Sequence, residues 1–171
     1  MDYQARRQHV AHHLPKDALA VIPAASEQFR NGDSHYRFRQ DSDFYYLTGF
    51  DEPDAVLLLT GGERSESILF NRPKHELEER WMGPRLGPID APAQLGVDAA
   101  FSLTELEARL PEILLDKQSI YYPMGRYPQH ERMLRHAWGY SKNQARRGQQ
   151  VPEIFADIMP ILSELRVIKD E

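Results

Sequence analysis

The sequence has 171 residues, no cysteine and a formal net charge of −5, with 41% hydrophobic and 27% charged residues. These values fit one globular domain rather than a disordered chain, and they exclude disulfides, thiolate metal ligands and a cysteine nucleophile. The acidic balance argues against nucleic acid, and without a roughly 20-residue apolar run or a signal-peptide stretch we expect no membrane partner and a cytoplasmic location.

Residues 2–40 predict a helix, a strand and a loop. Residues 2–14 have apolar side chains at helical spacing, and Pro15 ends the pattern. Residues 18–22 are apolar without alternation, which predicts a strand covered on both faces. Residues 24–40 are polar, and the Asn-Gly pair at 31–32 predicts a tight turn within an irregular loop.

The densest aromatic stretch, residues 41–50, predicts a corner around which the domain packs. Asp41, Ser42 or Asp43 can accept hydrogen bonds from the free amides of a short helical turn. Gly49 can end that turn with a positive φ, because it has no Cβ. We expect the aromatic side chains of this corner to be largely buried: Phe44, Tyr45, Tyr46 and Phe50.

Two apolar runs follow the corner. Residues 55–60 and 67–70 are joined by a Gly-rich segment with hairpin turn chemistry, which predicts adjacent antiparallel strands. Residues 71–98 are rich in Pro and Gly and have helical spacing only across 75–81. We expect one short helix and then an extended connection.

The next stretch predicts a capped helix and a strand. Residues 102–105 have the pattern of a capping box, with Ser102 and Glu105 as its members. An apolar helical stripe continues to residue 114, and Pro111 predicts that this element is kinked or split. Residues 119–122 are the next strand candidate.

The last part predicts two helices. Pro128 is placed as the first residue of a helix that turns Met133, Leu134, Ala137 and Trp138 toward the core, and Gly148 ends its basic tail. Pro160 is tolerable only in a first helical turn, so the last helix is expected to begin there. Apolar residues run through this stretch at roughly helical spacing: Ile154, Ile158, Ile161, Leu162, Leu165 and Ile168. Strands that alternate with helices, with one hairpin, predict an α/β domain with a mixed sheet covered by helices.

Motifs that would mark an independent hydrolase do not occur in the sequence: His-Glu-x-x-His, Gly-x-Ser-x-Gly and a phosphate loop. His9 with His12 or His13 could supply two imidazoles, but without a placed carboxylate the pattern favours surface histidines. The basic residues at 142–147 favour a solvated helix end over a phosphate-binding patch. The mixed aromatic and basic residues at 35–39 favour a charged edge or an interface over base stacking. Capping and turn roles are favoured over a cation cage for Asp41, Asp43, Asp51, Glu52 and Asp54.

Several of these pieces together carry a resemblance to a known family. They are the run Asp-Ser-Asp-Phe-Tyr-Tyr-Leu-Thr-Gly-Phe at 41–50, Asp-Glu-Pro at 51–53, Ile-Leu-Phe at 68–70, Trp-Met-Gly-Pro-Arg-Leu-Gly at 81–87 and the closing segment 164–169. In order and spacing the chain resembles the amino-terminal domain of bacterial Xaa-Pro aminopeptidases (aminopeptidase P).

The resemblance implies a three-layer α/β fold with a mixed sheet flanked by helices, related to the ribonuclease H arrangement and shared with creatinase and prolidase. It implies that residues 1–171 form one such domain and that a catalytic metallopeptidase domain of the pita-bread type, holding two metal ions, usually manganese, lies beyond it. We therefore expect no catalytic residue, no metal ligand and no cofactor in this segment, and no activity of the segment alone.

The implied activity of the complete polypeptide is release of an amino-terminal residue from peptides with proline at the second position. This domain would serve oligomerisation, as a homo-oligomer, and substrate access. Trp81, with Arg80 and Arg85, is the candidate site, because Gly and Pro predict a loop and exposed Trp and Arg are enriched at interfaces. In the family the matching segment can project toward the active site of another subunit.

Alternatives remain open at this point. Trp81 can equally fold onto its own core. The chain can be a stand-alone binding or assembly paralogue without peptidase activity, the equivalent domain of a prolidase, or an independent hydrolase. The gene sequence beyond Glu171 would distinguish the first of these from a domain of a longer enzyme.

Overall fold

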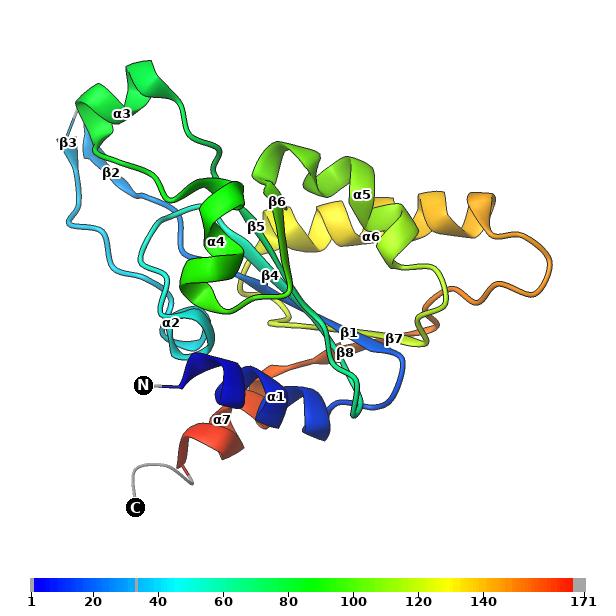
Figure 1. The fold of residues 1–171 in the computed structure, drawn as a ribbon. Helices are drawn as coiled ribbons and strands as arrows, with labels where there is room; N and C mark the ends of the chain where they lie inside the picture. Colours follow the sequence, from blue (N-terminus) through cyan, green and yellow to red (C-terminus); the bar gives the residue numbers. More distant parts are fainter. Residues whose placement is uncertain (1, 33, 168–171) are drawn as a thin grey trace.

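A six-stranded mixed sheet forms the centre of the molecule (Figure 1). The computed structural model describes residues 2–32 and 34–167. In sheet order the strands are β6 (Ala99–Ser102), β5 (Ser67–Asn71), β4 (Val56–Thr60), β1 (Ala18–Pro23), β7 (Ser119–Tyr122) and β8 (Ile154–Asp157). β4 pairs antiparallel with both β1 and β5, which confirms the predicted hairpin. The remaining pairs, β5–β6, β1–β7 and β7–β8, are parallel.

Helices cover both faces of the sheet (Figure 1). One face carries α1 (Tyr3–His13), α2 (Ser42–Thr48), α4 (Gly87–Leu95) and α7 (Met159–Val167). The other carries the 3-10 turn η1 (Leu103–Glu105), α5 (Leu106–Ile113) and α6 (Pro128–Gln144). This three-layer α/β arrangement with a mixed sheet confirms the predicted fold class.

The central strand β1 is buried at every position, as its unbroken apolar run predicts. Successive side chains of a strand point to opposite faces, so the strand serves two cores at once. Ala18, Ala20 and Ile22 pack beneath α1, α2, α4 and α7. Leu19 and Val21 pack beneath α5 and α6.

The structure corrects the prediction for residues 71–98. This stretch holds not one helix but two, α3 (Glu76–Met82) and α4, where an extended connection was expected. Pro88 lies in the first turn of α4, where its missing N–H costs nothing, and Gly96 ends the helix with a φ of 62°. Ala91 is fully buried against the sheet. Gly87, Pro88 and Gly96 thus lie at the ends of a helix, and Pro92 is accommodated inside it.

The edge strands β6 and β8 are not predicted by the sequence pattern. Ile154, which fits a helical stripe, lies instead in β8 with its side chain 57% exposed, while Ile158 just after the strand is fully buried. α7 begins at Met159, so Pro160 lies in its first turn as predicted. Ile168, the last member of the predicted stripe, lies outside the described residues.

The structure corrects two local predictions around α5, one of them in part. The Ser102 hydroxyl accepts from the Thr104 amide at 3.4 Å, but the Glu105 carboxylate accepts from the Arg109 side chain at 2.7 Å and forms no capping box. Arg109 lies one turn further along the helix and its cation takes the carboxylate. α5 runs on through the buried Pro111, so of the two predicted alternatives, a kink or a split, the split is wrong.

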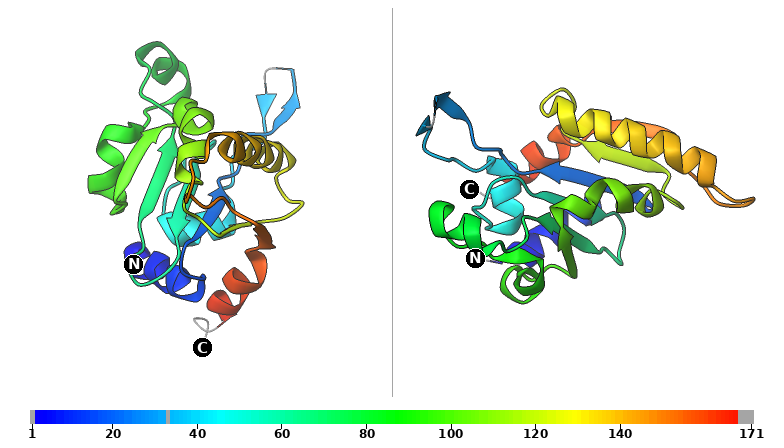
Figure 2. Two further views of the ribbon diagram at one scale, coloured as in Figure 1. Left: turned by 90° about the vertical axis from the view of Figure 1, so that its right-hand side faces the viewer. Right: turned by 90° about the horizontal axis from the view of Figure 1, so that it is seen from above.

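Two arms project from one end of the molecule (Figure 2). One is the hairpin of β2 (Phe29–Asn31) and β3 (Ser34–His35), inside the segment predicted to be an irregular loop. The predicted turn at 31–32 is confirmed, with Gly32 at a φ of 47°. The other arm is α3, which stands apart from both helical layers.

Candidate functional site

The helix α2 forms the predicted corner. The Asp41 carboxylate accepts hydrogen bonds from the amides of Asp43 (2.9 Å) and Phe44 (3.0 Å), which satisfies two of the four free N–H groups of the helix. Gly49 ends the helix in the left-handed region, at a φ of 65°. Both features confirm what the local sequence predicts.

The aromatic residues of this corner divide into two groups. Phe44 and Phe50 are buried and Tyr46 is half-buried, as expected. Tyr45 is 44% exposed, so the prediction of burial is wrong for this residue. Tyr45 follows Phe44 on a helix only seven residues long, and the helix has one buried face.

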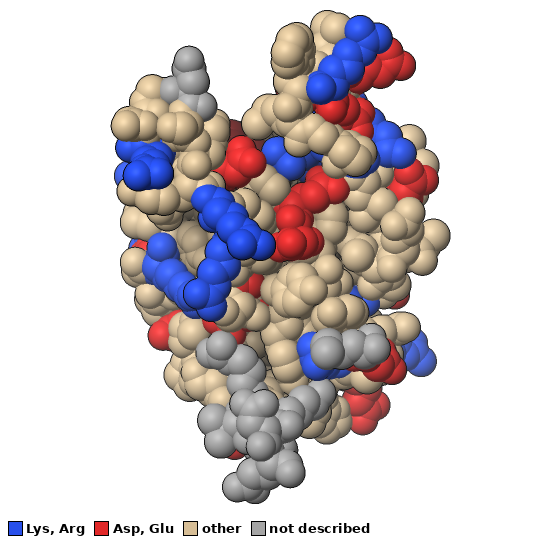
Figure 3. Space-filling view, turned by 90° about the vertical axis from the view of Figure 1, so that its left-hand side faces the viewer, with Lys and Arg blue, Asp and Glu red and all other residues tan. Residues whose placement is uncertain are grey.

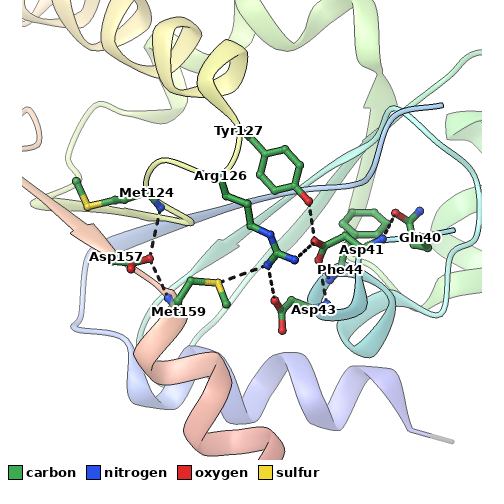
Figure 4. A network of polar contacts seen from close by, with 9 residues as sticks. All are labelled: Gln40, Asp41, Asp43, Phe44, Met124, Arg126, Tyr127, Asp157 and Met159. Carbon is green, nitrogen blue, oxygen red and sulfur yellow. Dashed lines mark hydrogen bonds and ion pairs between the residues drawn. The ribbon is translucent and has the colours of Figure 1, made fainter. Parts of the chain in front are cut away.

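A pair of residues far away in the sequence completes the corner (Figure 4). Arg126, in the loop between β7 and α6, pairs with Asp41 at 2.9 Å and with Asp43 at 3.0 Å. The Tyr127 hydroxyl donates to the Asp41 carboxylate at 2.6 Å. Burial and this hydrogen bond raise the pKa of Tyr127. Burial alone would lower the pKa of Arg126, but Asp41 and Asp43 outweigh it and raise that pKa.

Two arginines of α1 hold the other end of the corner. Arg7 is buried and donates to the carbonyl oxygens of Leu47 (2.9 Å), Leu95 (3.1 Å) and Gly96. One guanidinium therefore satisfies the free carbonyl ends of both α2 and α4, where the helix dipole favours a cation. Arg6 donates to the Tyr46 carbonyl at 3.0 Å. No local sequence pattern predicts these hydrogen-bond partners, because they lie at least 40 residues from the arginines in the sequence.

The sequence-predicted site residues lie on the second arm. α3 has no buried residue. The Trp81 side chain is 90% exposed, and Leu77, one turn earlier, is 65% exposed. The structure therefore does not fold Trp81 onto the domain core, and the two side chains form one apolar strip along the arm.

The two arginines beside Trp81 lie in different surroundings. Arg80 is exposed. The Arg85 side chain is only 9% exposed and donates to the Glu78 carboxylate and, at 3.2 Å, to the Pro73 carbonyl. The guanidinium of Arg85 thus ties the start of the arm to its end.

Carboxylates accept hydrogen bonds from three backbone amides at the start, the end and the base of the arm. Glu79 accepts from the Arg85 amide at 2.7 Å and from the His75 amide at 3.1 Å. At the base of the arm, Glu52 accepts from the Leu86 amide at 2.7 Å. Polar bonds, rather than apolar packing, hold the arm in place.

Metal-ligating side chains do not cluster within the described residues. Within 2–32 and 34–167 no group of three or more His, Asp or Glu side chains is arranged to hold a metal ion. His9, His12 and His13 are exposed on α1, and the Nδ1 atom of His13 lies 2.9 Å from the carbonyl oxygen of His9. In the same part of the chain, no helix has the length and apolar character that a membrane crossing needs.

Solved structures show the class to which this fold belongs. The low-pH form of aminopeptidase P from E. coli superposes with a TM-score of 0.91 at 36% identity, over 96% of this chain and 38% of that chain. Proline aminopeptidase P II from Yersinia pestis superposes with a TM-score of 0.90 at 38% identity, over the same shares. The fold is thus that of a domain within aminopeptidase P structures.

The sequence comparisons define the family. Residues 3–121 match the family described as aminopeptidase P, N-terminal domain, and the chain belongs to this family. Xaa-Pro aminopeptidase of Escherichia coli (strain K12) is 35% identical over 170 residues, which cover 98% of this chain and 38% of that protein. Xaa-Pro aminopeptidase 3 of Homo sapiens is 33% identical over 165 residues, with 90% and 30% covered. The chain spans less than two fifths of the length of these relatives.

Proposed function

We propose that this chain is the non-catalytic amino-terminal domain of a Xaa-Pro aminopeptidase of the cytoplasm. The relatives that match almost the whole chain carry that name, and each is more than twice as long. The complete polypeptide would release the amino-terminal residue from peptides whose second residue is proline. Two metal ions, usually manganese, would activate the attacking water in the rest of that polypeptide, since residues 2–32 and 34–167 provide no cluster of ligands for them.

The role we propose for this domain is assembly with other subunits and control of substrate access. The observation that carries it is the exposure of Trp81 on an arm without any buried residue. A Trp at 90% exposure leaves a large apolar surface in water unless another molecule covers it. A second subunit of a homo-oligomer, or a peptide at its active site, would provide that cover, and Arg80 would add a cation at the rim.

The test uses the complete enzyme with Trp81→Ala. We expect an oligomer by light scattering, in the wild type and in the variant, and kcat/KM for long Xaa-Pro peptides that falls by about tenfold while short ones change by less than about twofold. Tyr140→Ala is the matched control, because Tyr140 is an exposed aromatic on α6, away from the arm.

Two results would contradict the proposal. A complete enzyme that is monomeric and fully active removes the role in assembly. Equal losses in Trp81→Ala and Tyr140→Ala would show a general response to surface truncation rather than a role of the arm.

A further inference from the structure

A groove of about 770 Å³ lies beside the α2 corner, away from the core. Its lining includes Arg6, Arg37, Arg39, Tyr45, Tyr46 and Asp51. The segment from β3 to α2, which forms one wall, runs along the left-hand side of the molecule in Figure 1. Figure 3 views that side and shows Lys and Arg side chains gathered there, next to Asp and Glu side chains.

The cations of the groove are of two kinds. Arg6 is fixed: its guanidinium lies 4.1 Å from the centre of the Tyr46 ring and donates to the Tyr46 carbonyl. Arg37 and Arg39 are exposed, and within the described part of the chain neither forms an ion pair or a side-chain hydrogen bond. A protein with a net charge of −5 therefore places two free cations in one local groove.

The wall that carries the two free arginines is fixed in place by Gln40. This side chain is 7% exposed and makes four hydrogen bonds. Its oxygen accepts from the amides of Ala25 (2.8 Å) and Asp41 (2.9 Å), and its nitrogen donates to the carbonyls of Phe50 (3.2 Å) and Glu52 (2.8 Å). These bonds hold the backbone next to Arg39 to the corner. A ligand would therefore not lose binding free energy by ordering this part of the chain.

We propose that this groove binds an acidic peptide segment that also carries an aromatic or apolar side chain. Arg37 and Arg39 would take carboxylates, for which the guanidinium fork is matched. Tyr45, at 44% exposure, and the Arg6–Tyr46 stack would cover the apolar side chain.

The remaining polar groups favour a peptide over a nucleic acid. Asp51 and the Ser42 hydroxyl also line the groove. A peptide offers backbone N–H donors to these oxygens, whereas the sugar–phosphate backbone of DNA has no N–H group to donate to them. The groove is distinct from the α3 arm, and the inference does not depend on peptidase activity.

The experiment is a titration of the 171-residue chain with a fluorescein-labelled peptide Glu-Glu-Tyr-Glu-Glu, followed by fluorescence anisotropy at about 50 mM salt. We expect a Kd below about 100 μM and no binding of the matched peptide Lys-Lys-Tyr-Lys-Lys. The double variant Arg37→Gln/Arg39→Gln is expected to weaken binding by at least about tenfold, and Tyr45→Ala by about threefold.

Arg146→Gln/Arg147→Gln is the matched control. It removes the same charge at two other exposed arginines, after the end of α6, and is expected to change the Kd by less than about twofold. Trp81→Ala is expected to bind like the wild type, so this result and the test of the arm are independent of each other.

Other outcomes overturn the proposal. Equal weakening in the two double variants would mean unspecific attraction. Tighter binding of a fluorescein-labelled single-stranded oligonucleotide, lost in Arg37→Gln/Arg39→Gln, would assign the groove to nucleic acid. Self-association of the chain that the same double variant abolishes would assign it to a second copy, whose α3 presents Glu76, Glu78 and Glu79.

Discussion

The helices α2 and α3 are both seven residues long, and both begin with a side-chain cap, Asp41 in one and His75 in the other. α2 buries four of its residues and is held at both ends by arginines from distant segments. α3 buries none and is held by its own carboxylates and Arg85. Two elements with similar local signals thus differ in their surroundings: α2 is packed into the domain, and α3 keeps its side chains out of the core.

The largest effect on stability should come from Arg7, the buried arginine that holds the end of α2. We expect Arg7→Met to lower the free energy of unfolding by about 3–5 kcal/mol, because one buried and two part-buried carbonyl oxygens lose their donor. Urea unfolding followed by circular dichroism measures this. Gln8→Met, an exposed change on the same helix, should stay within about 0.5 kcal/mol. A similar small loss in both variants would show that α2 does not depend on Arg7.

A smaller effect on stability, and one that depends on pH, is expected for a substitution of Tyr127. Tyr127→Phe removes the hydrogen bond to Asp41 and should cost about 1–2 kcal/mol at neutral pH. Because the pKa of Tyr127 is raised, the folded protein keeps this proton to higher pH than the unfolded chain. The resulting stability is complete below about pH 10 and is lost as the pH rises through the raised pKa.

The wild type should therefore lose stability above about pH 10 more steeply than Tyr127→Phe, in urea titrations at several pH values. Tyr140→Phe serves as the control, since it changes an exposed tyrosine of α6. If the free energy of unfolding fell equally steeply above about pH 10 in the wild type and in Tyr127→Phe, the alkaline loss of stability would not come from Tyr127.

The variant Arg85→Gln tests how the α3 arm is held. Arg85→Gln breaks the contacts with Glu78 and the Pro73 carbonyl, so the amides of α3 should exchange hydrogen about tenfold faster. The midpoint of thermal unfolding should shift by less than about 2 °C, because the arm adds nothing to the core. Arg109→Gln, which breaks the exposed pair with Glu105, should leave exchange in α3 unchanged. A large fall in the midpoint would make the arm part of the cooperative core.

The smallest effect on stability is expected for Trp81→Ala, within about 0.5 kcal/mol of the wild type, because the side chain is 90% exposed. Trp138→Ala is the contrast. The Trp138 indole packs edge-on against Phe155 and donates to the Pro152 carbonyl at 2.6 Å, so its loss should cost about 3 kcal/mol. Urea unfolding of both variants makes the comparison. Comparable losses at the two tryptophans would show that the arm is packed in solution.

Local chemistry explains what could be predicted in both regions. The Asp41 cap, the end of α2 at Gly49 and the β4–β5 hairpin depend on residues close together in the sequence, and all three predictions are confirmed. Tyr45 shows the limit of such reasoning, since an aromatic stretch does not say which member faces solvent. The edge strand β8 shows another limit, because a four-residue strand with a half-buried pattern has no clear period.

The sequence by itself determined the fold class, the family resemblance, the position of the corner and the choice of Trp81 as a candidate site. Its motifs combine backbone preferences, caps and apolar periods, which act over a few residues. Only the tertiary structure decided what those motifs contact. Arg126 lies 83 residues from Asp43 and Arg7 lies 40 from Leu47, and chain topology alone brings these hydrogen-bonding groups together. The same holds for exposure: Trp81 and Trp138 are the same residue type, but Trp138 packs against the core while Trp81 lies on an arm outside it and remains in water.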